Sequence, residues 1–291
     1  MRPRVAIPLP HGSDSEYAQR AITQYERAVE LSGAEPVRIP LDRTPAEVMK
    51  LIERCDGVLL PGSKADVDPA KFDAERDPKT AAADPKRDTV DELLLQDAYN
   101  MRKPVLGICY GLQILNVYRS GTLLQHIESQ VNHEAGREVS EAHEVEVEEG
   151  SKLAEILQTT QNMPENTGKG TASSRAEHRS KSLHGTTVSR ALPVRVNSSH
   201  HQSADIIGDG LKIGARCPED GIIEALEGTS PDHFVLAVQW HPERSFDDDA
   251  NSRAIFSALV EAAKQKHEEL AGEFEGQSNA GEGARATRSN R

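Results

Sequence analysis

The stretch that most constrains the fold is residues 105–117, where a short apolar strand reaches a Gly-x-Cys-x-Gly turn and continues as a helix. Gly107 and Gly111 stand two residues before and two residues after Cys109. A strained strand-to-helix turn that carries a nucleophile at its tip needs small residues at both places. The pattern therefore predicts a nucleophile elbow at Cys109, where the amino end of the following helix favours thiolate over thiol.

A thiolate nucleophile needs a general base and a group that orients this base. The apolar stretch 234–240 ends in the sequence His241-Pro242-Glu243. Residues i and i+2 of an extended segment point to the same side, so Glu243 can hold the imidazole of His241 while the other ring nitrogen faces the sulfur. The sequence thus predicts a catalytic triad of Cys109, His241 and Glu243.

Strands and helices are expected to alternate along the first half of the chain. Apolar runs between turn residues predict strands, and apolar residues at helical spacing predict helices. The predicted strands are 4–9, 36–39, 57–60 and 105–108, and the predicted helices are 17–31, with Ser15 as N-cap, 45–54 and 89–101. Such alternation is typical of parallel βαβ units, whose ligands bind at the carboxyl ends of the strands.

The second half of the chain is less regular. Its predicted strands are 143–147, 194–196, 211–215, 222–226 and 234–238, and its predicted helices are 151–157 and 249–263. Residues 159–190 are rich in polar side chains and nearly lack apolar ones, which predicts a flexible insertion, either a lid over the site or a surface loop. The composition of residues 268–291 predicts a disordered tail.

Charge and composition limit the partners of the chain. A net charge of −13 over 291 residues argues against binding to nucleic acid, whose phosphates would be repelled. No stretch approaches the roughly 20 apolar residues of a membrane span, and residues 1–10 lack the apolar run of a signal peptide. Three scattered cysteines make no disulfide framework, so we expect a protein of the reducing cytoplasm.

The histidines give no metal-binding pattern in the sequence. His126, His133 and His143 have spacings that fit no common ligand set, and no cysteine or carboxylate at ligand spacing completes a set with His200 and His201. The sequence therefore predicts no metal and no cofactor.

Taken together, these motifs resemble the class I glutamine amidotransferase superfamily. The resemblance rests on Gly-Ile-Cys-Tyr-Gly-Leu-Gln at 107–113 and Gln-Trp-His-Pro-Glu at 239–243. The segments 60–69, 84–88 and 196–202 narrow it to the peptidase C26 branch, which includes gamma-glutamyl-gamma-aminobutyrate hydrolase of putrescine breakdown. The resemblance implies a doubly wound, mostly parallel α/β sheet flanked by helices, flavodoxin-like, in one domain over residues 1–267.

An oxyanion hole is expected beside the elbow. The backbone amide of Tyr110 is one donor because of its position just after the nucleophile. The resemblance implies that the amide of either Gly62 or Ser63 is the second donor.

Substrate contacts are implied by the same resemblance. The segment 197–202 is expected to hold a glutamyl head group, with Ser198 and His200 as the contacting residues. Gln113, one turn into the elbow helix, is either a further contact or a residue that faces solvent.

The activity implied is hydrolysis of the amide bond of a small gamma-glutamyl amine through a thioester on Cys109, with release of glutamate. Two alternatives stay open: a glutaminase subunit that supplies ammonia to a separate synthase partner, and a regulatory protein that keeps an unused triad. A homodimer is also open. C26 proteins of the putrescine type commonly carry Arg after the nucleophile, where this chain has Tyr110, and loss of that charge puts a gamma-aminobutyrate leaving group in doubt.

Overall fold

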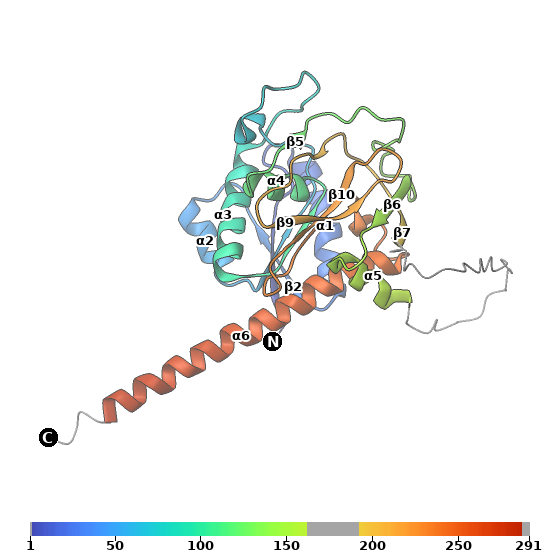
Figure 1. The fold of residues 1–291 in the computed structure, drawn as a ribbon. Coiled ribbons are helices and arrows are strands. Elements are labelled where there is room, and N and C mark those ends of the chain that lie inside the picture. Colours follow the sequence, from blue (N-terminus) through green and yellow to red (C-terminus); the bar gives the residue numbers. More distant parts are fainter. Residues whose placement is uncertain (1, 162–191, 287–291) are drawn as a thin grey trace.

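The computed structural model describes residues 2–161 and 192–286 of the chain. Within these residues a nine-stranded sheet has the order β2-β1-β3-β4-β11-β10-β9-β6-β7. Its first five strands are parallel: β1 (Arg4–Pro8), β2 (Glu35–Ile39), β3 (Gly57–Leu60), β4 (Val105–Ile108) and β11 (Val235–Val238). The fold is the expected α/β type, with a mostly parallel central sheet flanked by helices (Figure 1).

The remaining strands extend the sheet in antiparallel fashion. They are β10 (Ile223–Gly228), β9 (Leu211–Arg216), β6 (His143–Val147) and β7 (Leu192–Val196). A separate short pair joins β5 (Leu123–Leu124) to β8 (Ser203–Ala204). Sequence reasoning missed this pair because two residues carry no periodic pattern.

Helices cover both faces of the sheet and bury two cores. One core packs α1 (Ser15–Leu31), α5 (Lys152–Gln161) and α6 (Ala250–Ala286) on the sheet. The other packs α2 (Pro45–Ile52), α3 (Pro85–Met101) and α4 (Tyr110–Tyr118) on the opposite face. Two short 3-10 turns, η1 (Pro69–Phe72) and η2 (Pro242–Arg244), complete the assigned helices of the described residues.

The sheet places three loops side by side. β4 lies between β3 and β11, with Gly107 paired to Leu60 on one side and to Ala237 on the other. Because the three strands are parallel, the loops after them all leave the same edge of the sheet. These loops begin with Pro61, Cys109 and, after two further residues, His241.

Several helix boundaries differ from the sequence expectation: α3 begins at Pro85 and not at residue 89, and α2 ends at Ile52 and not at residue 54. Helix α1 is capped by Asp14, whose side chain accepts the Tyr17 amide at 2.9 Å, and not by Ser15. The end of α5 reaches Gln161, so residues 159–161 of the predicted insertion are helical, whereas residues 162–190 lie outside the described part of the chain.

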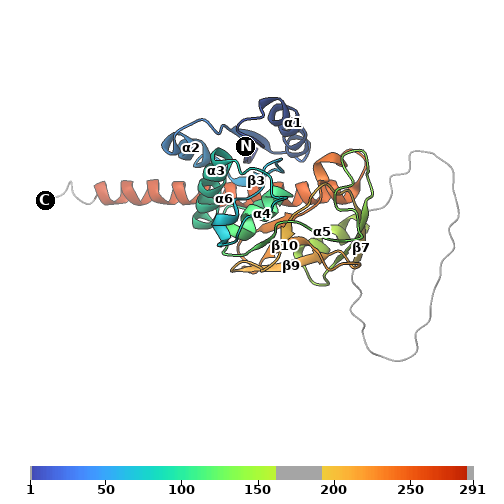
Figure 2. The ribbon, with the colours of Figure 1, turned by 90° about the horizontal axis from the view of Figure 1, so that it is seen from above.

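Helix α6 is much longer than predicted. It does not stop near residue 263 but continues to Ala286, so residues 268–286 of the predicted disordered tail are helical, and it extends beyond the rest of the fold (Figures 1 and 2). Residues 264–271 are mostly good helix formers, and Lys266 pairs with Glu269 at 3.2 Å on the same face. His267 also contacts Asp56 at 3.1 Å, which ties this part of the helix to the fold. Across the described residues, every helix is too short or too polar to cross a bilayer.

Candidate active site

Cys109 has the backbone conformation expected of a nucleophile elbow. Its φ is 54° and its ψ is −106°, between the end of β4 and the first residue of α4. A residue other than glycine rarely adopts a positive φ, and this strain is typical of a nucleophile held at a sharp turn. Cys109 is 6% exposed, with its amide bonded to the Val238 carbonyl of β11 at 2.9 Å.

The two glycines of the elbow have no room for a side chain. A Cβ on Gly107 would lie 2.7 Å from the Gly111 carbonyl oxygen, well inside van der Waals contact. A Cβ on Gly111 would collide with the Leu60 carbonyl oxygen of β3. The spacing of the motif therefore reflects the close approach of helix α4 to strands β3 and β4.

His241 and Glu243 contact each other as predicted, but the backbone that joins them is not the extended segment that the sequence predicted. His241 Nδ1 lies 2.8 Å from Glu243 Oε1, and both side chains are buried. The segment is not extended after His241, because Pro242 starts the 3-10 turn η2. The carboxylate thus reaches the imidazole through a tight turn.

The side chain of Asn197 makes two hydrogen bonds with the main chain of His241. Its Nδ2 donates to the His241 carbonyl at 2.9 Å, and its Oδ1 accepts the His241 amide at 3.0 Å. Asn197 is buried and follows β7 directly. No pattern in the sequence indicated this contact, which joins residues 44 positions apart.

Gly62 lies close to both Cys109 and His241. A Cβ built on Gly62 would stand 2.8 Å from His241 Cε1 and 3.6 Å from Cys109 Cβ. Cys109 and His241 therefore both lie close to this position. The Gly62 amide donates to the Tyr25 hydroxyl at 3.1 Å, and no acceptor is found within the described residues for the amide of Ser63.

Burial governs the protonation of the site. It raises the pKa of the Cys109 thiol to about 12, although Arg244 and the amide of Tyr110 act in the opposite direction. Burial also lowers the pKa of His241, against the opposing effect of Glu243. Burial would raise the pKa of Glu243, but its partners His241 and Arg244 lower it overall. In this structure the favoured pair is thus a neutral thiol and a neutral imidazole, and burial outweighs the helix-dipole effect expected at Cys109.

A cavity of about 320 Å³ opens beside Cys109 and His241. Cationic side chains line it: Arg20, Lys64, Arg137 and Arg244. Asp66 also lines it and is paired with His201 at 3.0 Å. In a chain with a net charge of −13, this gathering of positive charge favours an anionic ligand.

The predicted substrate contacts separate into two groups. Gln113 and His200 line the cavity, as does Ser63. Gln113 does not face solvent, because its Nε2 donates to the Gln202 carbonyl at 3.1 Å. Ser198 is not among the lining residues, since its buried hydroxyl donates to the His133 carbonyl at 2.7 Å. This hydroxyl braces the neighbouring loop and does not face the cavity.

The side chain of Tyr110 points away from the cavity. Its hydroxyl donates to Asp88 Oδ1 at 2.5 Å, and Arg87 lies over its ring at 5.0 Å, within the core beneath α3. Only the backbone of this residue can serve the site. The side chain at this position does not line the cavity, so the geometry gives no support to the argument from Tyr110 against a gamma-aminobutyrate leaving group.

Comparison with known proteins agrees with these motifs. The family model of peptidase C26 matches residues 9–243. A glutamine amidotransferase-like protein of Rickettsia prowazekii is 31% identical over 255 residues, which cover 82% of this chain and 88% of that protein. Gamma-glutamyl-gamma-aminobutyrate hydrolase of Escherichia coli K12 is 30% identical over 251 residues, which cover 83% and 85% of the two chains.

Solved structures agree at the level of the fold. A GMP synthase subunit from Thermoplasma acidophilum has a TM-score of 0.57 at 13% identity and covers 93% of this chain, with 98% of its own length matched. The glutaminase domain of Trypanosoma brucei CTPS has a TM-score of 0.54 at 16% identity, with 90% and 94% coverage. With its motifs, its fold and its relatives in agreement, the chain belongs to the peptidase C26 family of the class I glutamine amidotransferase-like proteins.

Proposed function

We propose that this protein hydrolyses the amide bond of a small gamma-glutamyl amine whose amine half carries a carboxylate, as gamma-aminobutyrate does, and that it releases glutamate through a thioester. Membership of the peptidase C26 family supports a hydrolase. The observation that carries the proposal is the meeting of Cys109 and the His241–Glu243 pair at one cavity lined by cationic side chains.

Acyl transfer begins with a proton transfer. Because the thiol and imidazole are both neutral, His241 takes the proton of Cys109 as the sulfur attacks the gamma-carbonyl carbon. The carbon–sulfur bond forms, and His241 returns the proton to the departing nitrogen as the carbon–nitrogen bond breaks. Glu243, on Nδ1, stabilises the imidazolium between these two transfers and leaves Nε2 for the reaction.

Water completes the cycle. His241 takes a proton from water as the water oxygen attacks the thioester carbon. The carbon–sulfur bond then breaks, His241 returns the proton to the Cys109 sulfur, and glutamate is released. The negative oxygen of each tetrahedral intermediate is stabilised by backbone amides. One donor is the amide of Tyr110, and the other is Ser63 or Gly62, the latter exchanging its Tyr25 partner for the substrate.

The charge of the cavity supports a substrate with two carboxylates. Of its four cationic residues, Lys64 is paired with Asp14 at 2.9 Å, and Arg244 Nε lies 3.7 Å from Glu243 Oε1. Arg137 bonds a neutral partner, the Gln24 side chain, at 2.6 Å, and no carboxylate pairs with Arg20 or Arg137 among the residues that the structure describes. Arg20 and Arg137 are thus the side chains with charge to offer to a ligand. The name of the Escherichia coli relative, a gamma-glutamyl-gamma-aminobutyrate hydrolase, supports the same substrate class.

A substrate panel tests the proposal. Glutamate release is measured from gamma-glutamyl-gamma-aminobutyrate, from gamma-glutamyl-butylamine, which lacks the second carboxylate, and from glutamine. We expect the first to be cleaved with the highest kcat/KM and Cys109→Ala to be inactive on all three. One charge-assisted contact contributes about 1.5–3 kcal/mol, so the second carboxylate should raise kcat/KM about 10- to 100-fold.

Charge removal identifies the recognising residue. Arg20→Gln and Arg137→Gln are compared with Arg43→Gln, a matched surface variant whose partner is Glu47 on helix α2. At least one cavity variant should erase the preference for the carboxylate-bearing substrate, and Arg43→Gln should keep it. Slow hydrolysis of glutamine alone would contradict the proposal and favour a glutaminase subunit with a separate synthase partner.

A further inference from the structure

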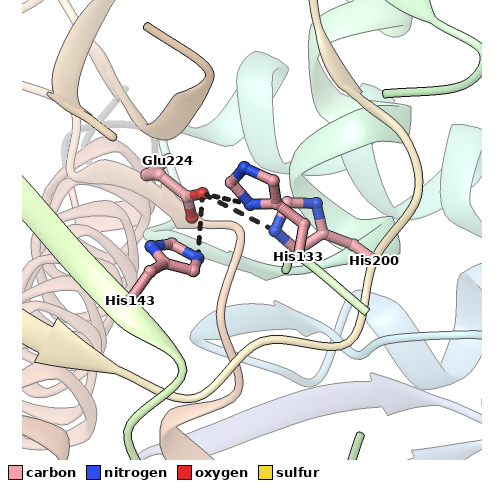
Figure 3. Close-up of side chains that lie close together, drawn as sticks. All are labelled: His133, His143, His200 and Glu224. Carbon is pink, nitrogen blue, oxygen red and sulfur yellow. Dashed lines mark ion pairs between the residues drawn. The ribbon is translucent and has the colours of Figure 1, made fainter. Parts of the chain in front are cut away.

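Four buried side chains from separate segments meet next to the cavity. They are His133 in the loop before β6, His143 at the start of β6, His200 after β7 and Glu224 in β10. Figure 3 shows their polar atoms pointing toward one another. None is more than 4% exposed, so bulk solvent does not reach these groups.

The central contacts are close but are not hydrogen bonds. Glu224 Oε1 lies 3.3 Å from His133 Nδ1, 3.5 Å from His143 Nε2 and 3.6 Å from His200 Nε2. All three nitrogens and both Glu224 oxygens lack a hydrogen-bond partner among the described residues. Unpaired buried polar atoms are rare in folded proteins, and five of them in one cluster require a common explanation.

In each imidazole, one ring nitrogen faces Glu224 and the other, called the outer nitrogen, makes a contact outside the cluster. These outer contacts show that the outer nitrogens carry protons. His133 Nε2 lies 2.8 Å from Asp220 Oδ2, His143 Nδ1 lies 3.2 Å from the Glu144 carbonyl, and His200 Nδ1 lies 3.0 Å from the Gln202 carbonyl. Carbonyl and carboxylate oxygens only accept, so each outer nitrogen carries a proton.

A neutral imidazole with its proton on the outer nitrogen presents a lone pair at the inner one. With all three imidazoles neutral, the centre of the cluster collects three nitrogen lone pairs and a carboxylate. These groups repel one another unless a cation lies between them.

We propose that His133, His143, His200 and Glu224 bind a divalent transition metal, with zinc as the best match. Zinc prefers tetrahedral sites of nitrogen, sulfur and carboxylate ligands, with metal–nitrogen distances of about 2.0–2.1 Å. Neighbouring ligands of such a tetrahedron stand about 3.3–3.4 Å apart, and the distances from Glu224 Oε1 are 3.3, 3.5 and 3.6 Å. Three imidazoles exclude magnesium and calcium as good matches, since both prefer oxygen ligands.

The outer contacts are those that orient metal-binding histidines. Such histidines donate their second nitrogen to a carboxylate or a backbone carbonyl, and each of the three does so here. Four protein ligands leave no open position, so the metal is structural and not a reactant.

The metal would hold the loop that shapes the catalytic cavity. His200 belongs to residues 197–202, together with Asn197, which clamps His241, and Gln202, whose carbonyl holds Gln113. The backbone carbonyl of Glu224 accepts a hydrogen bond from the amide of Gln239 at 2.8 Å, and Gln239 stands two residues before His241. The metal thus ties this loop to β6 and β10.

Metal binding is tested on the tag-free full chain. The protein is stripped with a chelator and titrated with ZnCl₂, and bound zinc is counted after gel filtration. We expect about one zinc per chain and a rise in the unfolding temperature. The cobalt-substituted chain should show the intense visible bands of tetrahedral Co²⁺, a readout that does not depend on activity.

Variants locate the site. His143→Gln and Glu224→Gln should lose the zinc, and Asp220→Asn should weaken its binding about 10- to 100-fold. His126→Gln is the matched control, because its ring lies beside His201 and outside the cluster. A wild-type chain that retains no zinc, or whose Co²⁺ spectrum is octahedral, would overturn the proposal. Zinc retained by a folded Glu224→Gln chain would also overturn the proposal. If the four residues only share a proton, the wild-type chain will retain no zinc.

Discussion

Replacing Asn197 with alanine tests whether a residue that takes no part in the chemistry positions His241, the proposed catalytic base. The change removes two hydrogen bonds, of 2.9 and 3.0 Å, from the main chain of His241. It leaves a buried N–H and a buried carbonyl without partners, each costing about 1–3 kcal/mol. We therefore expect the free energy of unfolding to fall by about 2–6 kcal/mol.

The effect on activity should exceed the effect of lost stability. A catalytic group displaced by about 1 Å can lose roughly 100-fold in rate, so kcat should fall by about that factor. KM should stay within a few-fold, because Asn197 does not line the cavity. The assay is glutamate release over a range of substrate concentrations, at a temperature where chemical denaturation shows the variant to be folded.

Asn116 offers a matched control. Its amide makes the same kind of clamp, donating to the carbonyls of Thr122 and Ile206 at 2.9 and 3.0 Å. It also accepts the Gly208 amide at 2.9 Å and lies outside the cavity. Asn116→Ala should lose similar stability and keep its kcat. Equal kcat losses in both variants, or a normal kcat in Asn197→Ala, would refute the positioning role.

Other perturbations give distinct outcomes. Gly111→Ala should lower the free energy of unfolding by about 1–3 kcal/mol, because its Cβ meets the Leu60 backbone, and an unchanged denaturation midpoint would refute the close approach. Burial lowers the pKa of His241 from 6.5, so the imidazole stays neutral below that pH. The value of kcat/KM should therefore stay level across neutral pH and fall only below pH 6.5. A fall that begins above pH 6.5 would contradict this. Glu243→Gln should lower kcat and shift this acid limb to still lower pH, since Glu243 raises the pKa of His241, and a shift upward would show another role. Removing the residues after His267 should leave activity intact, because no residue in the described part of α6 beyond that point lines the cavity; a large loss would show that the tail reaches the site.

The elbow could be predicted because its cause is local. Gly107, Cys109 and Gly111 are set by one turn of backbone, and the structure shows the steric reason for each glycine. The parallel strands could be predicted equally well, because apolar runs typical of strands alternate with apolar residues at helical spacing over short stretches of sequence. The meeting of His241 and Glu243 followed from their two-residue separation, even though the turn itself differed.

Contacts over long distances in the chain escaped prediction. The clamp on His241 and the cluster around Glu224 each join segments that only the sheet brings together. The direction of the Tyr110 side chain escaped for another reason: a motif fixes which residue follows the nucleophile but not which core its side chain enters. The length of α6 was underestimated because the prediction relied on the composition of the tail. It gave too little weight to the helix-forming residues that follow Ala263.

The central claim, that Cys109 is the nucleophile, is tested most directly by trapping the acyl enzyme. The chain is mixed with gamma-glutamyl-p-nitroanilide, whose amine leaves readily, and is quenched in acid and analysed by peptide mass spectrometry. We expect a gamma-glutamyl group on the peptide that contains Cys109, and none on those that contain Cys55 or Cys217. Steady release of nitroaniline with Cys109 unlabelled, or with the label on another cysteine, would contradict the claim.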